Sequence, residues 1–165
     1  MRSWIRNLAF VACLLPLPAA AHTFSLPSDS PVINVTIPDS LEPVDTLRGA
    51  EGGVSQERTF NVLVEPIDVS NAKTATDEAL KILLLHGNEV DPTSVKQASR
   101  KINGLDAVDV SFTITDGVEA AGFTLIATKP GASFMAVIHY GSHEGIKANS
   151  AALASIIGSI QPIRK

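Results

Sequence analysis

The chain has 165 residues, with 13 Lys and Arg against 17 Asp and Glu, which gives a formal net charge of −4. This acidic balance argues against a nucleic-acid partner, because phosphate binding needs clustered Lys and Arg. After residue 21 no apolar run approaches the roughly 20 residues of a membrane-spanning helix. We therefore expect a domain that neither spans a membrane nor binds nucleic acid.

The first 21 residues have the pattern of an export signal. Arg2 and Arg6 form a short basic start, residues 8–17 are apolar, and residues 19–21 are three alanines, which is typical of a cleavage site. We expect cleavage after Ala21. Residues 1–21 would then be a signal peptide, and residues 22–165 would form one periplasmic or secreted domain with a net charge of −6.

The single cysteine, Cys13, bears on both localisation and chemistry. It lies inside the expected signal, so the mature domain would contain neither a thiol nor a disulfide. An alternative is that residues 10–13 act as a lipoprotein signal in which Cys13 is acylated. The apolar run continues beyond Cys13, which favours the cleaved form without a lipid.

The first part of the expected domain contains two strand patterns. Residues 22–31 hold two prolines and predict a short arm with a turn. Residues 32–37 alternate apolar and polar side chains and stop at Pro38, which is typical of a strand. Residues 60–65 repeat this alternation and predict a second strand.

The segment between these strands is rich in Gly, Pro and acidic residues. We expect residues 38–58 to be mainly loop, with a strand over residues 46–50 and a turn or mobile loop at Gly52-Gly53. Because function concentrates on loops, residues 47–58 and the turns further along the chain are candidate contact surfaces.

Two helices are predicted. The first begins at Thr74, which can cap it, with Asp77 at the capping-box position, and it ends near Gly87. The second covers residues 144–160, with Ser142 as its cap.

Four strand patterns lie between the two helices, over residues 95–102, 105–115, 121–128 and 133–140. The first turn is Asn103-Gly104, the strongest short signal for a hairpin. Residues 116–117 and 129–131 supply the other turns. Turns this short join antiparallel neighbours, since parallel strands need a long crossover. The element order therefore predicts an α+β fold with an antiparallel sheet and two helices.

Three segments resemble the PsbP/Mog-type family. They are residues 32–38, where an early strand ends in Pro, residues 102–107, around the hairpin turn, and residues 154–160, in the closing helix. The resemblance extends over nearly all of residues 23–162, and it implies a single α-β-α sandwich, an antiparallel sheet flanked by helices. Members of that family are mostly binding and assembly proteins, so the resemblance implies a non-enzymatic module and does not select its partner.

The histidines are the candidate metal ligands. With cleavage after Ala21, the chain would begin at His22, which offers an α-amino group and a ring nitrogen to copper. The candidate metal set is His22, His139 and His143, with His86 as another source of a third ligand. A structural alternative places His143 in the first turn of the second helix and His86 at the end of the first.

No catalytic or cofactor motif emerges from the sequence. The spacings Gly-x-Ser-x-Gly, Gly-x-Gly-x-x-Gly and His-Glu-x-x-His do not occur. We expect no catalytic residues and no cofactor, and a protein partner in the cell envelope. Two alternatives stay open besides catalysis: copper at His22, and an apolar ligand or lipid between the first helix, with its Leu80 and Leu84, and the sheet.

Overall fold

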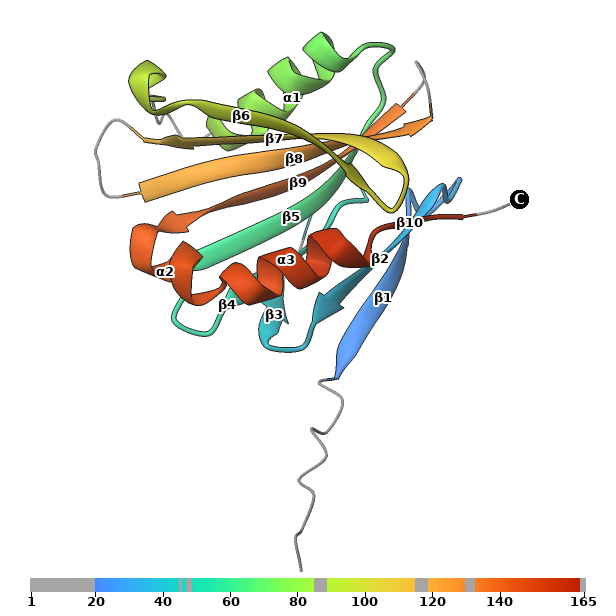
Figure 1. Cartoon of the computed structure of the whole chain (residues 1–165). Coiled ribbons are helices and arrows are strands. Elements are labelled where there is room, and N and C mark those ends of the chain that lie inside the picture. The colour runs from blue at the N-terminus through green and yellow to red at the C-terminus, as the bar shows by residue number, and fades with distance from the viewer. Residues whose placement is uncertain are drawn as a thin grey trace, which may run out of the picture.

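The structure is a computed structural model, and it describes residues 20–44, 46, 49–84, 89–114, 119–129 and 133–163. These residues form one α+β domain with two antiparallel sheets (Figure 1). The larger sheet is the middle layer of an α-β-α sandwich. Helix α1 (Ala72–Leu84) covers one face, and α2 (His143–Ala148), α3 (Ser150–Ser159) and the smaller sheet lie against the other. The predicted fold class is confirmed.

The seven-stranded sheet has the order β3-β4-β5-β9-β8-β7-β6. Its strands are β3 (Leu41–Pro43), β4 (Glu51–Ser55), β5 (Phe60–Ile67), β6 (Lys96–Ile102), β7 (Leu105–Thr113), β8 (Glu119–Lys129) and β9 (Ser133–Ser142). The four strands β6 to β9 form the predicted antiparallel meander, each paired with the next. A short 3₁₀ helix, η1 (Pro92–Ser94), precedes β6. The predicted turns at residues 116–117 and 130–131 lie outside the described residues.

The smaller sheet joins the two ends of the described chain. Its strands are β1 (Ala21–Leu26), β2 (Ile33–Pro38) and β10 (Gln161–Pro162), in the order β1-β2-β10. The prediction of an arm over residues 22–31 is wrong for its first half, because β1 pairs with β2 along its whole length. Helix α3 packs on β2, so this sheet closes one side of the core.

The core consists of two apolar clusters, one on each face of the large sheet. On β9, Phe134, Ala136 and Ile138 pack toward α1, whereas Met135 and Val137 pack toward α3 and the smaller sheet. The period-2 alternation of the sequence produces this division, because successive side chains of a strand point to opposite faces.

Two glycines predicted to form a turn lie instead inside strand β4. Gly52 and Gly53 pair with Leu63 and Val62 of β5. A Cβ at residue 52 would lie 2.7 Å from the carbonyl oxygen of Val62, so glycine is what lets these backbones approach. Most of residues 51–55 is therefore buried, and the prediction that residues 47–58 form a loop-like contact surface is wrong for this strand.

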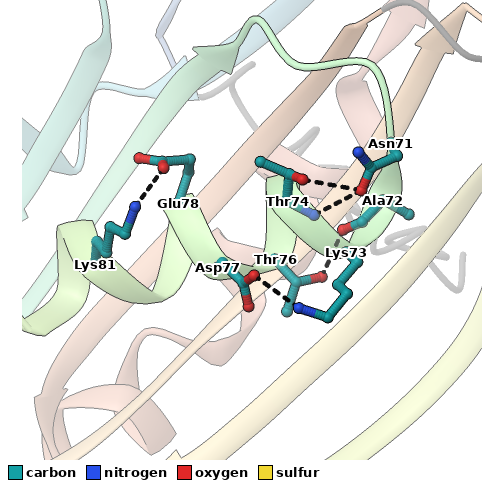
Figure 2. A network of polar contacts seen from close by, with 8 residues as sticks. All are labelled: Asn71, Ala72, Lys73, Thr74, Thr76, Asp77, Glu78 and Lys81. Carbon is teal, nitrogen blue, oxygen red and sulfur yellow. Dashed lines mark hydrogen bonds and ion pairs between the residues drawn. The ribbon is translucent and has the colours of Figure 1, made fainter.

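The cap of helix α1 lies three residues before the predicted cap, Thr74. The side-chain oxygen of Asn71 accepts hydrogen bonds from the backbone N–H of Thr74, at 2.9 Å, and from its hydroxyl, at 3.0 Å (Figure 2). Asn71 thus caps the helix, and the prediction of Thr74 as the cap is wrong. Asp77 does not reach back to the cap, because it pairs with Lys73 at 3.2 Å. The predicted end near Gly87 lies outside the described residues.

The predicted closing helix is two helices. Ser142 caps α2 as expected, since its hydroxyl accepts from the N–H of Gly145 at 3.0 Å. The break falls at Asn149, whose side-chain amide donates to the carbonyl of Gly145 at 2.9 Å. Side chains that bond to nearby backbone compete with a continuous helix, which accounts for the break.

Candidate functional site

Strand β6 is the free edge of the large sheet. Among the described residues it pairs with β7 alone, and six of its seven residues are exposed. Three of the seven side chains are basic: Lys96, Arg100 and Lys101. Such an edge leaves one row of backbone N–H and C=O groups without a neighbouring strand.

The hairpin fixes which backbone groups face outward. The turn residues Asn103 and Gly104 both have positive φ, at 49° and 87°, as a two-residue hairpin requires. Ile102 and Leu105 close this turn and form two backbone hydrogen bonds with each other. From there, hydrogen-bonded and non-hydrogen-bonded residue pairs alternate along β6 and β7. The residues whose backbone groups point to the open edge are therefore Gln97, Ser99 and Lys101.

A groove of about 400 Å³ lies beside this edge, between β6 and the two closing helices. We call it the β6 groove; it is lined by residues 100–103 and by Ile146, Ser150, Leu153, Ala154, Ile157 and Gly158. Its hairpin end is anchored by Asn103, whose side-chain amide donates to the carbonyls of Gly158, at 3.0 Å, and Ile160, at 2.6 Å. Figure 1 shows the hairpin tip reaching the end of α3.

Ion pairs hold two of the basic side chains of β6: Lys101 contacts Asp106 at 2.6 Å, and Arg100 contacts Asp109. Arg100 contacts the carboxylate of Asp109 with both Nε, at 2.6 Å, and a terminal nitrogen, at 3.0 Å. Thr124 donates a further hydrogen bond to Asp109, at 2.6 Å. This arrangement leaves Asp109 committed to neighbours of its own sheet, and so it is not a free metal ligand.

His139 lies in β9, on the same face of the large sheet as Asp109. Burial lowers its pKa to about 4, and the charge of Asp109 offsets this only in part. Its Nδ1 atom is buried without a hydrogen-bond partner among the described residues. Its ring lies over Gly122 of β8, where any side chain would collide with it. A neutral, enclosed imidazole of this kind is poorly placed to act as an exposed metal ligand.

The structure does not gather the predicted metal set. His139 is enclosed in the sheet, whereas His143 is exposed as the first residue of α2, and His86 lies outside the described residues. Within the part of the chain that the structure describes, no three His, Cys, Asp or Glu side chains are grouped so that they could hold a metal ion. Copper binding that uses the α-amino group of a chain beginning at His22 stays a prediction.

His22 itself has a partner that the sequence did not indicate. Its Nδ1 lies 2.8 Å from a carboxylate oxygen of Asp39, and its side chain is 73% exposed. His22 also borders a second hollow, of about 220 Å³, which we call the N-terminal pocket. It is lined by His22, Phe24, Ile37, Pro38, Leu41, Pro43, Val44, Glu51 and Gly52. Only the pairing of β1 with β2 brings residues 22 and 39 together.

Small, buried side chains of α1 lie against the sheet, and a hollow of about 310 Å³ borders the first residue of the helix, Ala72. Ala75 and Ala79 are fully buried and let the helix lie close to the sheet, where Phe112, Phe123 and Phe134 belong to the same cluster. Leu80 and Ile82 pack against that cluster as well. This packing favours a closed core, and an apolar ligand at this place stays a prediction.

No helix of the described residues is both long and apolar enough to cross a membrane. No protein-family model matches the sequence, and no curated protein matches it. Solved structures, however, match the fold.

The chain is similar in structure to cyanobacterial PsbP (CyanoP) from Synechocystis sp. PCC 6803, with a TM-score of 0.61 and 12% identity over 96% of this chain and 99% of that one. It is also similar to LpqN of Mycobacterium tuberculosis, a protein involved in cell envelope biogenesis, with a TM-score of 0.56 and 12% identity over 87% and 92%. The chain therefore has a PsbP/Mog-type fold, as its sequence resemblance implied. Identities this low define the fold alone.

Proposed function

We propose that this protein is an exported, non-enzymatic binding module of the cell envelope that acts through protein–protein contacts at the β6 edge. The free backbone row of Gln97, Ser99 and Lys101, beside the β6 groove, is the observation that carries the proposal. An extended segment of a partner can add to such an edge as a further strand, with main-chain hydrogen bonds giving affinity and side-chain pockets giving specificity.

The charge of the edge favours another protein over a second copy of this chain. If two β6 strands paired antiparallel with Ala98 opposite Ala98, Lys96 would lie opposite Arg100 of the second copy. Like charges directly opposite destabilise a strand pair. An acidic or polar segment meets no such repulsion, and basic edges are a common protection against self-association.

Two observations support a location in the cell envelope: the predicted export signal at residues 1–21, and the similarity of the fold to LpqN. We infer that cleavage follows Ala21 and that residues 22–165 act in the periplasm or outside the cell. LpqN, which shares the fold, is involved in cell envelope biogenesis in its own organism.

A crosslinking experiment tests the proposal. A photo-crosslinking residue at Gln97, introduced into the exported protein in its own cells, should give a discrete adduct with a second protein. The same residue at Lys73, 87% exposed on α1, serves as the control and should not give that adduct.

Two variants at one position separate strand addition from other contacts. Ser99→Pro removes an outward N–H that β7 does not use, so it should abolish the adduct, whereas Ser99→Ala should keep it. Circular dichroism checks that both variants are folded. If Ser99→Pro is unfolded, Lys96→Glu takes its place, and its adduct should be weakened. The proposal fails if the adduct forms undiminished in folded Ser99→Pro, or in Lys96→Glu where that variant takes its place. It also fails if the adduct forms equally from position 73 or consists of two copies of this chain.

A further inference from the structure

The backbone pairing of β1 with β2 positions the ion pair between His22 and Asp39. His22 pairs with Ile37 across β1 and β2, and Asp39 follows the last residue of β2. Four more pairs, from Thr23 to Leu26, hold β1 in this register, and the hydroxyls of Thr23 and Thr36 are hydrogen bonded at 2.9 Å. Cleavage after Ala21 would remove the pairs of Ala20 and Ala21 and leave these in place.

The separation of the two side chains matches two neighbouring ligands of one metal ion. Nδ1 of His22 and Oδ1 of Asp39 are 2.8 Å apart. In a square-planar or tetragonal site with bonds of about 2.0 Å, two ligands at right angles are about 2.8 Å apart. An ion could therefore bind both atoms at this separation, once the two side chains turn so that both lone pairs point at it.

A chain beginning at His22 adds a third ligand from the same residue. Its α-amino nitrogen and Nδ1 can close a six-membered ring around a metal ion, made of the metal, both nitrogens and the three carbons between them. Two nitrogens and one carboxylate oxygen in a tetragonal arrangement suit Cu(II), which binds most strongly among the divalent ions of its row. Copper displaces the protons that these ligands would otherwise carry.

We propose that the mature protein binds one Cu(II) ion through the α-amino nitrogen and Nδ1 of His22 and the carboxylate of Asp39. The N-terminal pocket adjoins this position and leaves room for a water or small ligand, and Glu51 lines its wall. His139 and His143 have no part in this site. The inference shares with the proposed function the export step that creates the free amino group, and it is otherwise independent of the β6 edge.

The test begins by defining the N-terminus of the exported protein by mass spectrometry. The mature protein is then titrated with Cu(II) alone, with calorimetry for affinity and electron paramagnetic resonance for geometry. We expect one ion per chain, an axial spectrum with two nitrogen ligands, and an affinity at least about tenfold above that of the free peptide His-Thr-Phe-Ser, which has the chelate but no Asp39.

Three variants show whether the fold builds the site. Asp39→Asn should lower the affinity to about that of the peptide, and His22→Ala, which removes the imidazole ligand, should lose the axial signal of this site. Glu42→Gln, an exposed carboxylate on the neighbouring strand β3, is the matched control and should bind copper as the wild type does. Folding of each variant is checked by circular dichroism.

Several results would overturn the copper site. These are a mature N-terminus other than His22, an affinity equal to that of the free peptide, or copper binding that Asp39→Asn leaves unchanged. An N-terminus at His22 without copper binding would refute this inference alone, because the crosslinking result at β6 does not depend on it.

Discussion

Gly122 lies directly opposite His139 in the large sheet, and the ring of His139 occupies the space that a side chain at residue 122 would need. They are paired across β8 and β9, and a Cβ at residue 122 would lie 2.9 Å from Cε1 of His139 and 2.5 Å from the carbonyl oxygen of Val110. The absence of a side chain at Gly122 is therefore what leaves room for the imidazole over β8. This relationship explains how a large polar ring can be mostly buried against the backbone of the sheet.

Gly122→Ala should destabilise the protein by about 1–3 kcal/mol, because the added methyl group meets a backbone carbonyl that cannot move freely. Urea denaturation measures the loss. Gly158→Ala is the matched control: nothing lies within 4 Å of a Cβ there, and the position is exposed near the end of α3. That variant should gain about 0.5–1 kcal/mol, since alanine favours helix over glycine. Equal losses in both variants would contradict the crowding at Gly122.

The enclosure of His139 should make stability depend on pH. Burial lowers its pKa from 6.5 to about 4, so between these values the unfolded chain binds more protons than the folded one. The contribution of His139 to stability is therefore complete above about pH 6.5 and is lost as the pH falls to about 4, by about 3 kcal/mol in total.

Urea denaturation at intervals from pH 4 to pH 7.5 checks this dependence. His139→Phe keeps a ring of similar shape and removes the titrating group, so the part of the slope due to His139 should disappear. A slope that is the same in wild type and His139→Phe would show that other groups cause it.

The side chain of Asn103 should link the hairpin to α3. Asn103→Gly keeps the positive φ of the turn but removes both hydrogen bonds to the carbonyls of Gly158 and Ile160. We expect a loss of about 1–2 kcal/mol and faster amide hydrogen exchange in the last turn of α3. Asn103→Asp should cost more, because a carboxylate would face the same two carbonyls. Unchanged exchange in α3 would argue against the link.

The cap of α1 should depend on Asn71 and not on Thr74. Asn71→Ala removes the acceptor for the N–H of Thr74 and should cost about 1 kcal/mol, whereas Asn71→Asp keeps an acceptor and should retain most of the stability. Thr74→Ala leaves the backbone bond to Asn71 in place and should cost less than Asn71→Ala. Thermal unfolding followed by circular dichroism gives the order of the three variants.

The sequence predicted most strands because their signals are local. The alternation over residues 60–65 and 133–140, and the Asn103-Gly104 turn, depend on neighbours within a few residues, and the structure confirms them. Even the register of β6 on β7 follows from that turn, which places Arg100 near Asp109. The outward-facing backbone groups of β6 could therefore have been anticipated from this turn, whereas the position of β6 at the edge of the sheet could not.

The errors fall where a distant segment determines the local structure. Gly52 and Gly53 form a strand because β5 approaches them closely, and residues 21–26 form a strand because β2 lies alongside. One error, by contrast, has a local cause: Asn71 and Thr74 are both good capping residues, and the nearby sequence does not choose between them.

The sequence by itself determined which segments carry the apolar repeat of a strand and which carry that of a helix. These patterns predict an antiparallel sheet and helices, because side-chain direction in a strand or helix repeats over a few residues. Only the tertiary structure decided which polar groups meet. His22 and Asp39 are 17 positions apart, and His139 and Gly122 also 17, and their contacts exist because backbone hydrogen bonds between strands align them. Such alignment depends on the whole ladder and on the packing behind it, which no short stretch of residues encodes.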